Sequence, residues 1–365
     1  MGRPEPERFG MEVEMRVVHM DSGLGNQMLD YAEYMAICWQ NPDEDCYLEN
    51  LIYELPQKEG MFSIWNGYEL ERIFGINPPN VKSLFDDAAW KRILEKVEQS
   101  EFWKENWNYA PYITQALNEE GLHLTNLRKR PNISGEEPVS IKKRLRLHLT
   151  RFFNTRMGYH IKRHMRRLLA PKLIAQANGA YDVYRTYPSD VYIGHSFAFK
   201  YKGFGIERMD EQIREAFRFP EITDDKNRKM LQMIQSCNSV SIHARRSDLL
   251  FLNGYCYKFG FFKRSVKYMK KHVKDPVFVF FTDENSVGWC EENEKVFGLD
   301  FKKDKVCFVD WNKGENSFRD MQLMAECKHN IFTESTFGFW GAYLNRNPEK
   351  ITCAPDPLIL ATHSF

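Results

Sequence analysis

Residues 239–248 read SVSIHARRSD, an apolar run that ends in two adjacent arginines. The run predicts a buried strand with Arg245 and Arg246 at its carboxyl end. His243 and Asp248 flank the pair. Two planar guanidinium groups form a compact cationic fork, and such a fork neutralises the growing charge of a diphosphate leaving group without a metal. Taken alone, an arginine pair at a strand end is also a common surface or salt-bridge element.

The chain downstream of residue 225 alternates between strand-like and helix-like segments. Continuous apolar runs predict strands, and amphipathic runs between them predict helices. The strands are expected at 277–282, 305–310 and 330–335, and the helices at 261–274, 318–328 and from 336 onward. This alternation is typical of a doubly wound, Rossmann-like sheet, in which ligands bind at the carboxyl ends of parallel strands. We therefore expect a C-terminal nucleotide-binding domain over residues 221–365.

Polar residues follow the later strands of that domain. Ser335 and Thr336 stand where a strand enters a helix, and hydroxyl and free N–H groups at a helix N-terminus form an anion site. The alternative is that Ser335 and Thr336 only cap the helix. Asp320 lies on the preceding helix, and its carboxylate could accept from guanine N1–H and the exocyclic amine. The alternative is that Asp320 is an ordinary solvated carboxylate on a helix.

A second α/β unit opens the chain. Residues 15–20 (MRVVHM) predict a strand, residues 22–27 (SGLGNQ) a glycine turn, and Asn26 the N-cap of a following helix. The turn is not G-x-G-x-x-G and lacks a fitting acidic residue about 20 positions on, so a dinucleotide site is not expected. We expect a flexible extension at 1–14 and an N-terminal α/β domain with a helical insertion at 15–220.

The composition narrows the class of protein. The 365 residues carry a formal net charge of +1, so no global field points to nucleic acid. No stretch approaches the roughly 18 apolar residues of a membrane span, and no signal core is present, which predicts a cytoplasmic protein. Eight cysteines without a C-x-x-C pair fit neither a zinc site nor a disulfide framework. Asp43-Glu44-Asp45 has a D-x-D pattern but lies in a polar loop, so we expect no metal.

Residues 139–170 form a strongly basic region. Helical spacing places Ile141, Leu145 and Leu149 on one face with lysines and arginines off it, and residues 159–170 repeat the scheme. Two amphipathic helices with solvated basic faces are the simplest interpretation. The alternative is peripheral contact with anionic lipid, or with a lipid-linked substrate, at the inner face of a membrane.

Taken in order, these segments resemble glycosyltransferase family 11, the α-1,2-fucosyltransferases. GLGNQMLDYA (23–32) is similar to the family's GGLGNQMFQYA, and SIHARRSD (241–248) to the HxRRxD motif that the family shares with α-1,6-fucosyltransferases. Residues 308–345 follow the family pattern almost segment for segment. Ser22 stands where the family has a glycine, and residues 193–204 lack the family's usual Trp-Gln, which leaves the acceptor open.

The resemblance implies a GT-B fold, with two Rossmann-like domains that face each other across a cleft. The C-terminal domain would hold GDP-fucose and the N-terminal domain the acceptor. It implies a bacterial enzyme that transfers L-fucose from GDP-β-L-fucose, with inversion, to a hydroxyl of a galactoside, forming an α-1,2 linkage. GDP-fucose is then a substrate, and no cofactor is expected. The acceptor would be a galactose-containing oligosaccharide or a lipid-linked glycan. The alternatives are a fucosyltransferase of another linkage, α-1,6-like, and a glycan- or nucleotide-binding module without turnover.

The resemblance also assigns roles to residues. Arg245 would bind the β-phosphate, Arg246 would support it, and Asp248 would orient both arginines. His243 and Asp320 would hold guanosine. The diphosphate pocket would be lined by Ser335, Thr336 and Phe337. Gly25, Asn26 and Gln27 would approach the fucose from the other domain. For the general base, Asp21, Asp30 and His243 stay open.

Overall fold

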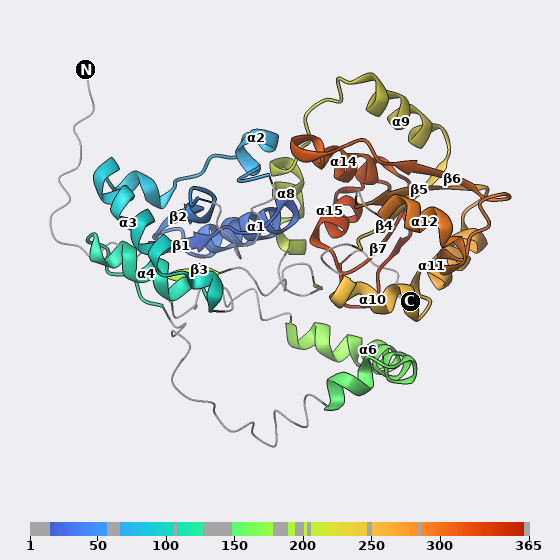
Figure 1. Cartoon of the computed structure of the whole chain (residues 1–365), viewed down its shortest axis with the longest axis horizontal. Helices are drawn as coiled ribbons and strands as arrows, with labels where there is room; N and C mark the ends of the chain where they lie inside the picture. The colour runs from blue at the N-terminus through green and yellow to red at the C-terminus, as the bar shows by residue number, and fades with distance from the viewer. Residues whose placement is uncertain are drawn as a thin grey trace.

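The chain, described here by a computed structural model, contains two parallel α/β units that lie side by side (Figure 1). The structure describes residues 15–56, 66–105, 108–126, 148–177, 189–193, 201–202, 206–246, 250–283 and 286–360. In Figure 1 the segment from β1 to α4 runs from blue to teal, and the segment from α8 to α15 runs from yellow to red. The expected extension at 1–14 lies outside the described residues, as do positions 194–200 and 203–204 of the 193–204 segment and the part of the basic region that contains Ile141 and Leu145.

The N-terminal sheet has three parallel strands in the order β2–β1–β3. Its strands are β1 (Met15–His19), β2 (Asp45–Glu49) and β3 (Val191–Ile193), and its helices are α1 (Leu24–Gln40), α2 (Leu70–Phe74), α3 (Asp87–Gln99) and α4 (Ala110–Glu119). Val17 and Val18 are adjacent in β1 and point to opposite faces of the sheet. Val17 packs into the core beneath α3 and α4, and Val18 into the core that contains α1. Both faces of this sheet are therefore covered.

The C-terminal sheet has five parallel strands in the order β6–β5–β4–β7–β8. Its strands are β4 (Asn238–Ala244), β5 (Pro276–Thr282), β6 (Lys305–Val309), β7 (His329–Phe332) and β8 (Thr352–Cys353). The helices of this half are α8 (Asp210–Ala216), α9 (Asp225–Ser236), α10 (Leu250–Lys258), α11 (Phe261–His272), α12 (Val287–Glu292), α13 (Glu294–Phe297), α14 (Phe318–Glu326) and α15 (Thr336–Leu344). Helix α6 (Arg156–Ala177) lies below α10 in Figure 1.

The register of the C-terminal sheet aligns the carboxyl ends of its strands. Ala244 of β4 pairs with Thr282 of β5, and Phe281 of β5 pairs with Val309 of β6. On the other side, His243 of β4 pairs with Phe332 of β7. Because the strands are parallel and end level, the residues that follow them lie along one edge of the sheet.

One hydrophobic core joins the two units. It contains Val18 and Met28 from the N-terminal unit and Phe332 and Trp340 from the C-terminal unit. Phe217, directly after α8, packs edge-on against Trp340 of α15, with ring centroids 5.0 Å apart, and against Phe74 of α2 in the N-terminal unit, with centroids 5.3 Å apart. The units are thus packed against each other and not merely tethered.

The structure confirms the predicted α/β fold class with two parallel units, as a GT-B protein requires. Two local predictions were wrong. Asn26 does not cap α1, because the helix begins at Leu24 and Gly23, with extended backbone angles, is its N-cap. The strand expected at 330–335 ends at Phe332, so Ser335 lies beyond it.

Candidate active site

A single carboxylate holds the arginine pair at the end of β4. Arg245 Nη1 lies 2.9 Å from Asp283 Oδ1, and the backbone N–H of Arg246 donates to Asp283 Oδ2 over 2.6 Å. Asp283 directly follows β5, the neighbouring strand, and only 8% of its side chain is exposed. The Arg245 side chain keeps 29% of its surface accessible at the sheet edge. Asp248, predicted to orient the pair, lies outside the described residues.

Arg246 is held differently from Arg245. Its guanidinium carbon lies 3.3 Å from the ring centroid of Trp289 and 5.2 Å from that of Tyr257, which are cation–π contacts. Tyr257 also donates from its hydroxyl to the carbonyl oxygen of Arg245 over 2.8 Å. Arg246 therefore packs on aromatic rings from α10 and α12, while its backbone shares the carboxylate of Asp283.

His243 is buried at the end of β4. Its ring stacks on Phe337, with centroids 5.7 Å apart, and its Nδ1 has no hydrogen-bond partner among the described residues. Burial, together with the Arg245 cation, lowers the pKa of His243 to about 4, and the Asp283 carboxylate only partly opposes this. The imidazole is therefore neutral near pH 7. It offers one donor and one acceptor but is a weak general base.

Asp320 begins a polar network in the first turn of α14. Its Oδ1 accepts from Asn312 Nδ2 over 2.8 Å, and Asn312 Oδ1 accepts from Asn227 Nδ2 over 2.8 Å. Burial raises the pKa of Asp320 to about 7, because the single hydrogen bond from Asn312 does not offset the lost hydration. Asp320 is half-buried and hydrogen-bonded, and in this it departs from an ordinary solvated carboxylate.

The N-terminus of α15 is not capped by the side chains expected to cap it. Ser335 is the N-cap residue and is buried, but its hydroxyl makes no capping hydrogen bond. The Thr336 hydroxyl donates instead to Asn26 Oδ1 across the two units, over 2.8 Å. The double cap weighed from the sequence is therefore not formed, and Thr336 joins the two units.

Gly25 makes this contact between the units sterically possible. A Cβ atom at this position would lie 2.6 Å from the backbone nitrogen of Phe337 and 2.7 Å from Thr336 Oγ1. The Gly25 carbonyl accepts from Trp340 Nε1 over 2.9 Å. The first turns of α1 and α15 are therefore in direct contact, and the partial positive charges of two helix N-termini lie close together.

Gln27 is committed to the protein itself. It is fully buried, and its Nε2 donates to the carbonyls of Ser22 and Gly67 over 3.0 and 2.9 Å. Its Oε1 accepts from the backbone N–H of Glu69 over 2.8 Å. Both donors and the acceptor are engaged with backbone, so in this structure Gln27 fixes the 66–69 loop against α1 and does not face a ligand.

Carboxylates gather where β1 leads into α1. Asp30 is buried, and its Oδ2 accepts from the backbone N–H of Asp21 over 3.2 Å. Burial raises the pKa of Asp30 well above its usual range, and the nearby Asp21 and Glu33 carboxylates add to the shift. Glu33, which was not predicted, accepts from the Tyr192 hydroxyl over 2.9 Å. The two carboxylates proposed as general bases thus lie together, one before and one after Gly25 in the chain.

Two kinds of feature are absent from the part of the chain that the structure describes. There, no three or more His, Cys, Asp or Glu side chains are grouped in a way that could hold a metal ion. No helix among those residues is long and apolar enough to cross a membrane. The eight cysteines, all within the described ranges, are free.

Comparisons with known proteins agree on one family. Residues 155–358 match the family model of Glycosyl transferase family 11. An Alpha-1,2-colitosyltransferase of Escherichia coli is 32% identical over 154 residues, which cover 40% of this chain and 50% of that protein. A Galactoside alpha-(1,2)-fucosyltransferase 1 of Saimiri sciureus is 29% identical over 151 residues, covering 38% of this chain and 39% of that protein. The match thus spans half or less of these relatives.

Solved structures of similar fold include two of the fucosyltransferase NodZ. The structure from Bradyrhizobium has 13% sequence identity and a TM-score of 0.40, and the comparison covers 91% of this chain and 93% of that one. The α-1,6-fucosyltransferase NodZ co-crystallised with GDP has 13% identity and a TM-score of 0.39, covering 91% and 92%. Because the family model covers more than half of the present sequence, the chain belongs to glycosyltransferase family 11.

Proposed function

We propose that this protein transfers L-fucose from GDP-β-L-fucose to a hydroxyl of a galactoside, with inversion, and forms an α-1,2 linkage. The observation that carries the proposal is the arginine at the end of β4. Arg245 is held on one side by Asp283 and remains partly accessible at the carboxyl edge of a doubly wound sheet. Membership of the family and the α-1,2 names of two relatives support the linkage.

The leaving group defines what Arg245 has to do. GDP departs with an extra negative charge, and a guanidinium whose position is already fixed stabilises that charge without reorganising. The first turns of α1 and α15 lie in contact nearby in the fold, and helix N-termini favour anions. Together these groups supply positive charge for a diphosphate, so we expect the reaction to need no metal ion.

The nucleoside and the acceptor use other parts of the same two units. Asp320, at the N-terminus of α14, offers a desolvated carboxylate for the paired N–H groups of guanine. His243 offers a neutral imidazole. Of the general-base candidates, Asp30 has a pKa that burial raises well above its usual range, and His243 has a pKa lowered to about 4, so we favour the β1–α1 carboxylates as bases.

One experiment tests the proposal and its two alternatives. The purified chain is incubated with GDP-fucose and a panel of galactosides, GDP release is measured, and the product linkage is determined by NMR. Acceptor-dependent GDP release with an α-1,2 product supports the proposal. Another linkage would favour the α-1,6-like alternative, and GDP binding without turnover would favour a binding module. Because one relative is named a colitosyltransferase, GDP-colitose is included as a second donor.

A further inference from the structure

Among the residues that the structure describes, helix α6 packs on the protein through one face. Tyr159 is buried, and its ring lies 5.3 Å from those of Tyr255 and Phe259, at and just beyond the end of α10. Arg166, two turns further along α6, pairs with Asp356 over 2.6 Å. The spacing of seven residues puts Tyr159 and Arg166 on the same side of a helix with 3.6 residues per turn. That side is the docked face.

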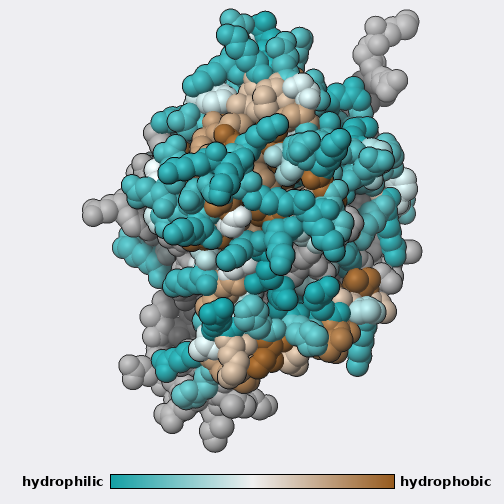
Figure 2. Space-filling model, turned by 90° about the vertical axis from the view of Figure 1, so that its right-hand side faces the viewer, coloured by the Kyte–Doolittle hydropathy of each residue, from teal (hydrophilic) through white to brown (hydrophobic). Residues whose placement is uncertain are grey.

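The opposite face of α6 presents an apolar stripe to solvent. Met157, Ile161, Met165 and Leu168 follow the spacing of a single helical face. Met157 is 64% exposed and Leu168 is 69% exposed. Brown side chains gather at the lower end of the face in Figure 2, the end at which α6 lies in Figure 1. These four residues are called the α6 stripe below.

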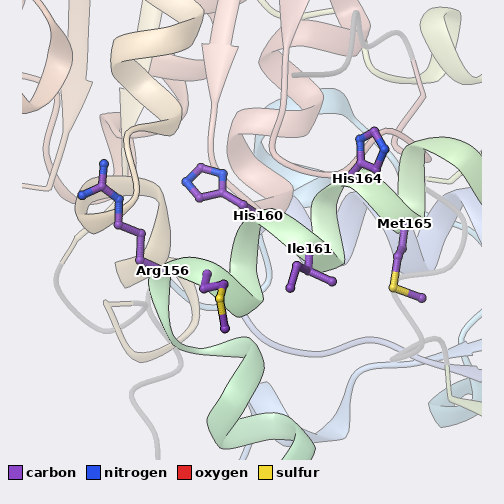
Figure 3. Close-up of a pocket in the computed structure, with 6 residues that line it drawn as sticks. Arg156, His160, Ile161, His164 and Met165 are labelled. Carbon is purple, nitrogen blue, oxygen red and sulfur yellow. The ribbon is translucent and has the colours of Figure 1, made fainter.

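A hollow of about 740 Å³ runs along this helix. It is lined by Arg156, Met157, His160, Ile161, His164 and Met165, and none of the donor-site candidates contributes to it (Figure 3). In Figure 3, Ile161 and Met165 point to one side of the helix and His164 to the other. The hollow is therefore a feature of the α6 surface and not of the nucleotide site.

The charge around the stripe has one sign. The described segment 148–177 contains no Asp or Glu and seven Lys or Arg, which are Arg151, Arg156, Lys162, Arg163, Arg166, Arg167 and Lys172. Arg156, Lys162, Arg167 and Lys172 are exposed and flank or continue the stripe. An exposed apolar stripe bordered by cations is the signature of a helix that lies in a membrane interface.

We propose that the α6 stripe and its flanking cations bind the surface of an anionic lipid bilayer. The apolar side chains would enter the headgroup boundary, and the four exposed cations would meet lipid phosphates. A second copy of the chain is a poorer partner, because a twofold contact across this face would set cation against cation. The inference depends on neither the donor nor the reaction proposed above.

The bound orientation would bring the candidate active site near the lipid. Tyr159 of α6 packs on Tyr255, whose hydroxyl donates to Glu334 over 2.7 Å. Glu334 directly precedes Ser335, the N-cap of α15. Two side-chain contacts therefore separate the lipid-binding helix from the first turn of α15, a short path for an acceptor that is itself anchored in the bilayer.

Co-sedimentation of the full chain with vesicles tests the proposal. Vesicles of phosphatidylglycerol mixed with phosphatidylcholine are compared with pure phosphatidylcholine, at low and high salt. The charge variant R156Q/K162Q/R167Q/K172Q should bind roughly 600-fold more weakly, at about fivefold per cation near the surface. The stripe variant M157S/I161S/L168S keeps every charge and should also lose binding. All of these residues are exposed, so both variants should melt like the wild type.

The control removes the same charge elsewhere. K263Q/K267Q/K271Q/K274Q changes four exposed lysines on and after α11, whose apolar face is buried. This variant should bind anionic vesicles almost as well as the wild type. The proposal is overturned if the wild type ignores anionic vesicles, or if the α11 control weakens binding as much as the α6 charge variant. A concentration-dependent dimer that the stripe variant dissolves, without vesicle binding, would assign the stripe to a second copy and overturn it too.

Discussion

Arg245→Lys should remove most of kcat while the protein still melts near the wild-type temperature. Arginine can hold Asp283 with one edge of its planar fork and a phosphate oxygen with the other, whereas lysine offers a single point charge. Losing one preorganised donor to a developing anion costs about 2.7–4 kcal/mol, or roughly two to three decades of rate. The contact should strengthen as the bond breaks, so kcat should fall more than the KM for GDP-fucose rises.

A double-mutant cycle with Asp283 tests the role of Arg245 further. Its carboxylate forms an ion pair with the Arg245 guanidinium and accepts a hydrogen bond from the Arg246 backbone N–H. A hydrogen bond to a charged group contributes about 1.5–3 kcal/mol, so Asp283→Asn should lower kcat roughly 10- to 150-fold. If Asp283 acts by positioning Arg245, the double variant should lose little more than Arg245→Lys alone. Independent residues would give the sum, about 4–7 kcal/mol.

The cycle is measured by steady-state kinetics with GDP-fucose and a galactoside, alongside thermal melts and calorimetry with GDP. Asp304→Asn is the matched control, because Asp304 pairs with Lys270 over 2.7 Å before β6, at the opposite edge of the same sheet. It should leave kcat unchanged. Fully additive losses in the double variant, or near-normal kcat in a folded Arg245→Lys protein, would refute the assignment of the diphosphate to this arginine.

Three further outcomes follow from the geometry. Asp320→Asn should weaken GDP binding by about 1–3 kcal/mol. In the wild type, GDP affinity measured by calorimetry should rise with pH until about 7 and then level off, because only the ionised carboxylate accepts both guanine N–H groups. The variant should lose this pH dependence. Ser22→Gly should raise the unfolding free energy by about 0.5–1 kcal/mol in denaturant titrations, because Ser22 has a φ of 59°, in the left-handed region that favours glycine. A lower stability of the variant would show that the Ser22 side chain matters more than its backbone conformation. Activity should survive EDTA, because Arg245 and two helix N-termini supply the positive charge; complete loss restored by manganese would contradict this.

The sequence was sufficient for the architecture and for the arginine at the strand end. Apolar runs such as 277–282 are long enough to identify buried parallel strands, and a polar residue after such a run must lie at the carboxyl edge of the sheet. Asp283 was missed because its role depends on register. Only the pairing of Ala244 with Thr282 reveals that the next residue on β5 reaches the arginines after β4.

Neighbouring residues of the glycine turn show a second limit. Asn26 and Gln27 look equivalent in sequence, yet they are about 100° apart on a helix and so face different surroundings. Asn26 faces Thr336 of the other unit, whereas Gln27 faces the backbone of its own unit. Periodicity predicts that a helix forms, but which side chain faces the other unit depends on the position of a partner more than 300 residues away.

The backbone contact at Gly25 has a consequence for engineering acceptor range. Because we expect the N-terminal unit to hold the acceptor, exchanging it for that of a relative is a natural way to recruit a new glycan. Gly25 and Trp340 belong to one interface, however, and the fit allows no added atom at position 25. A chimera spliced between the sheets would join an α1 and an α15 that never adapted to each other. A functional graft therefore has to carry both helices from the same parent, even though one of them lies near the far end of the chain.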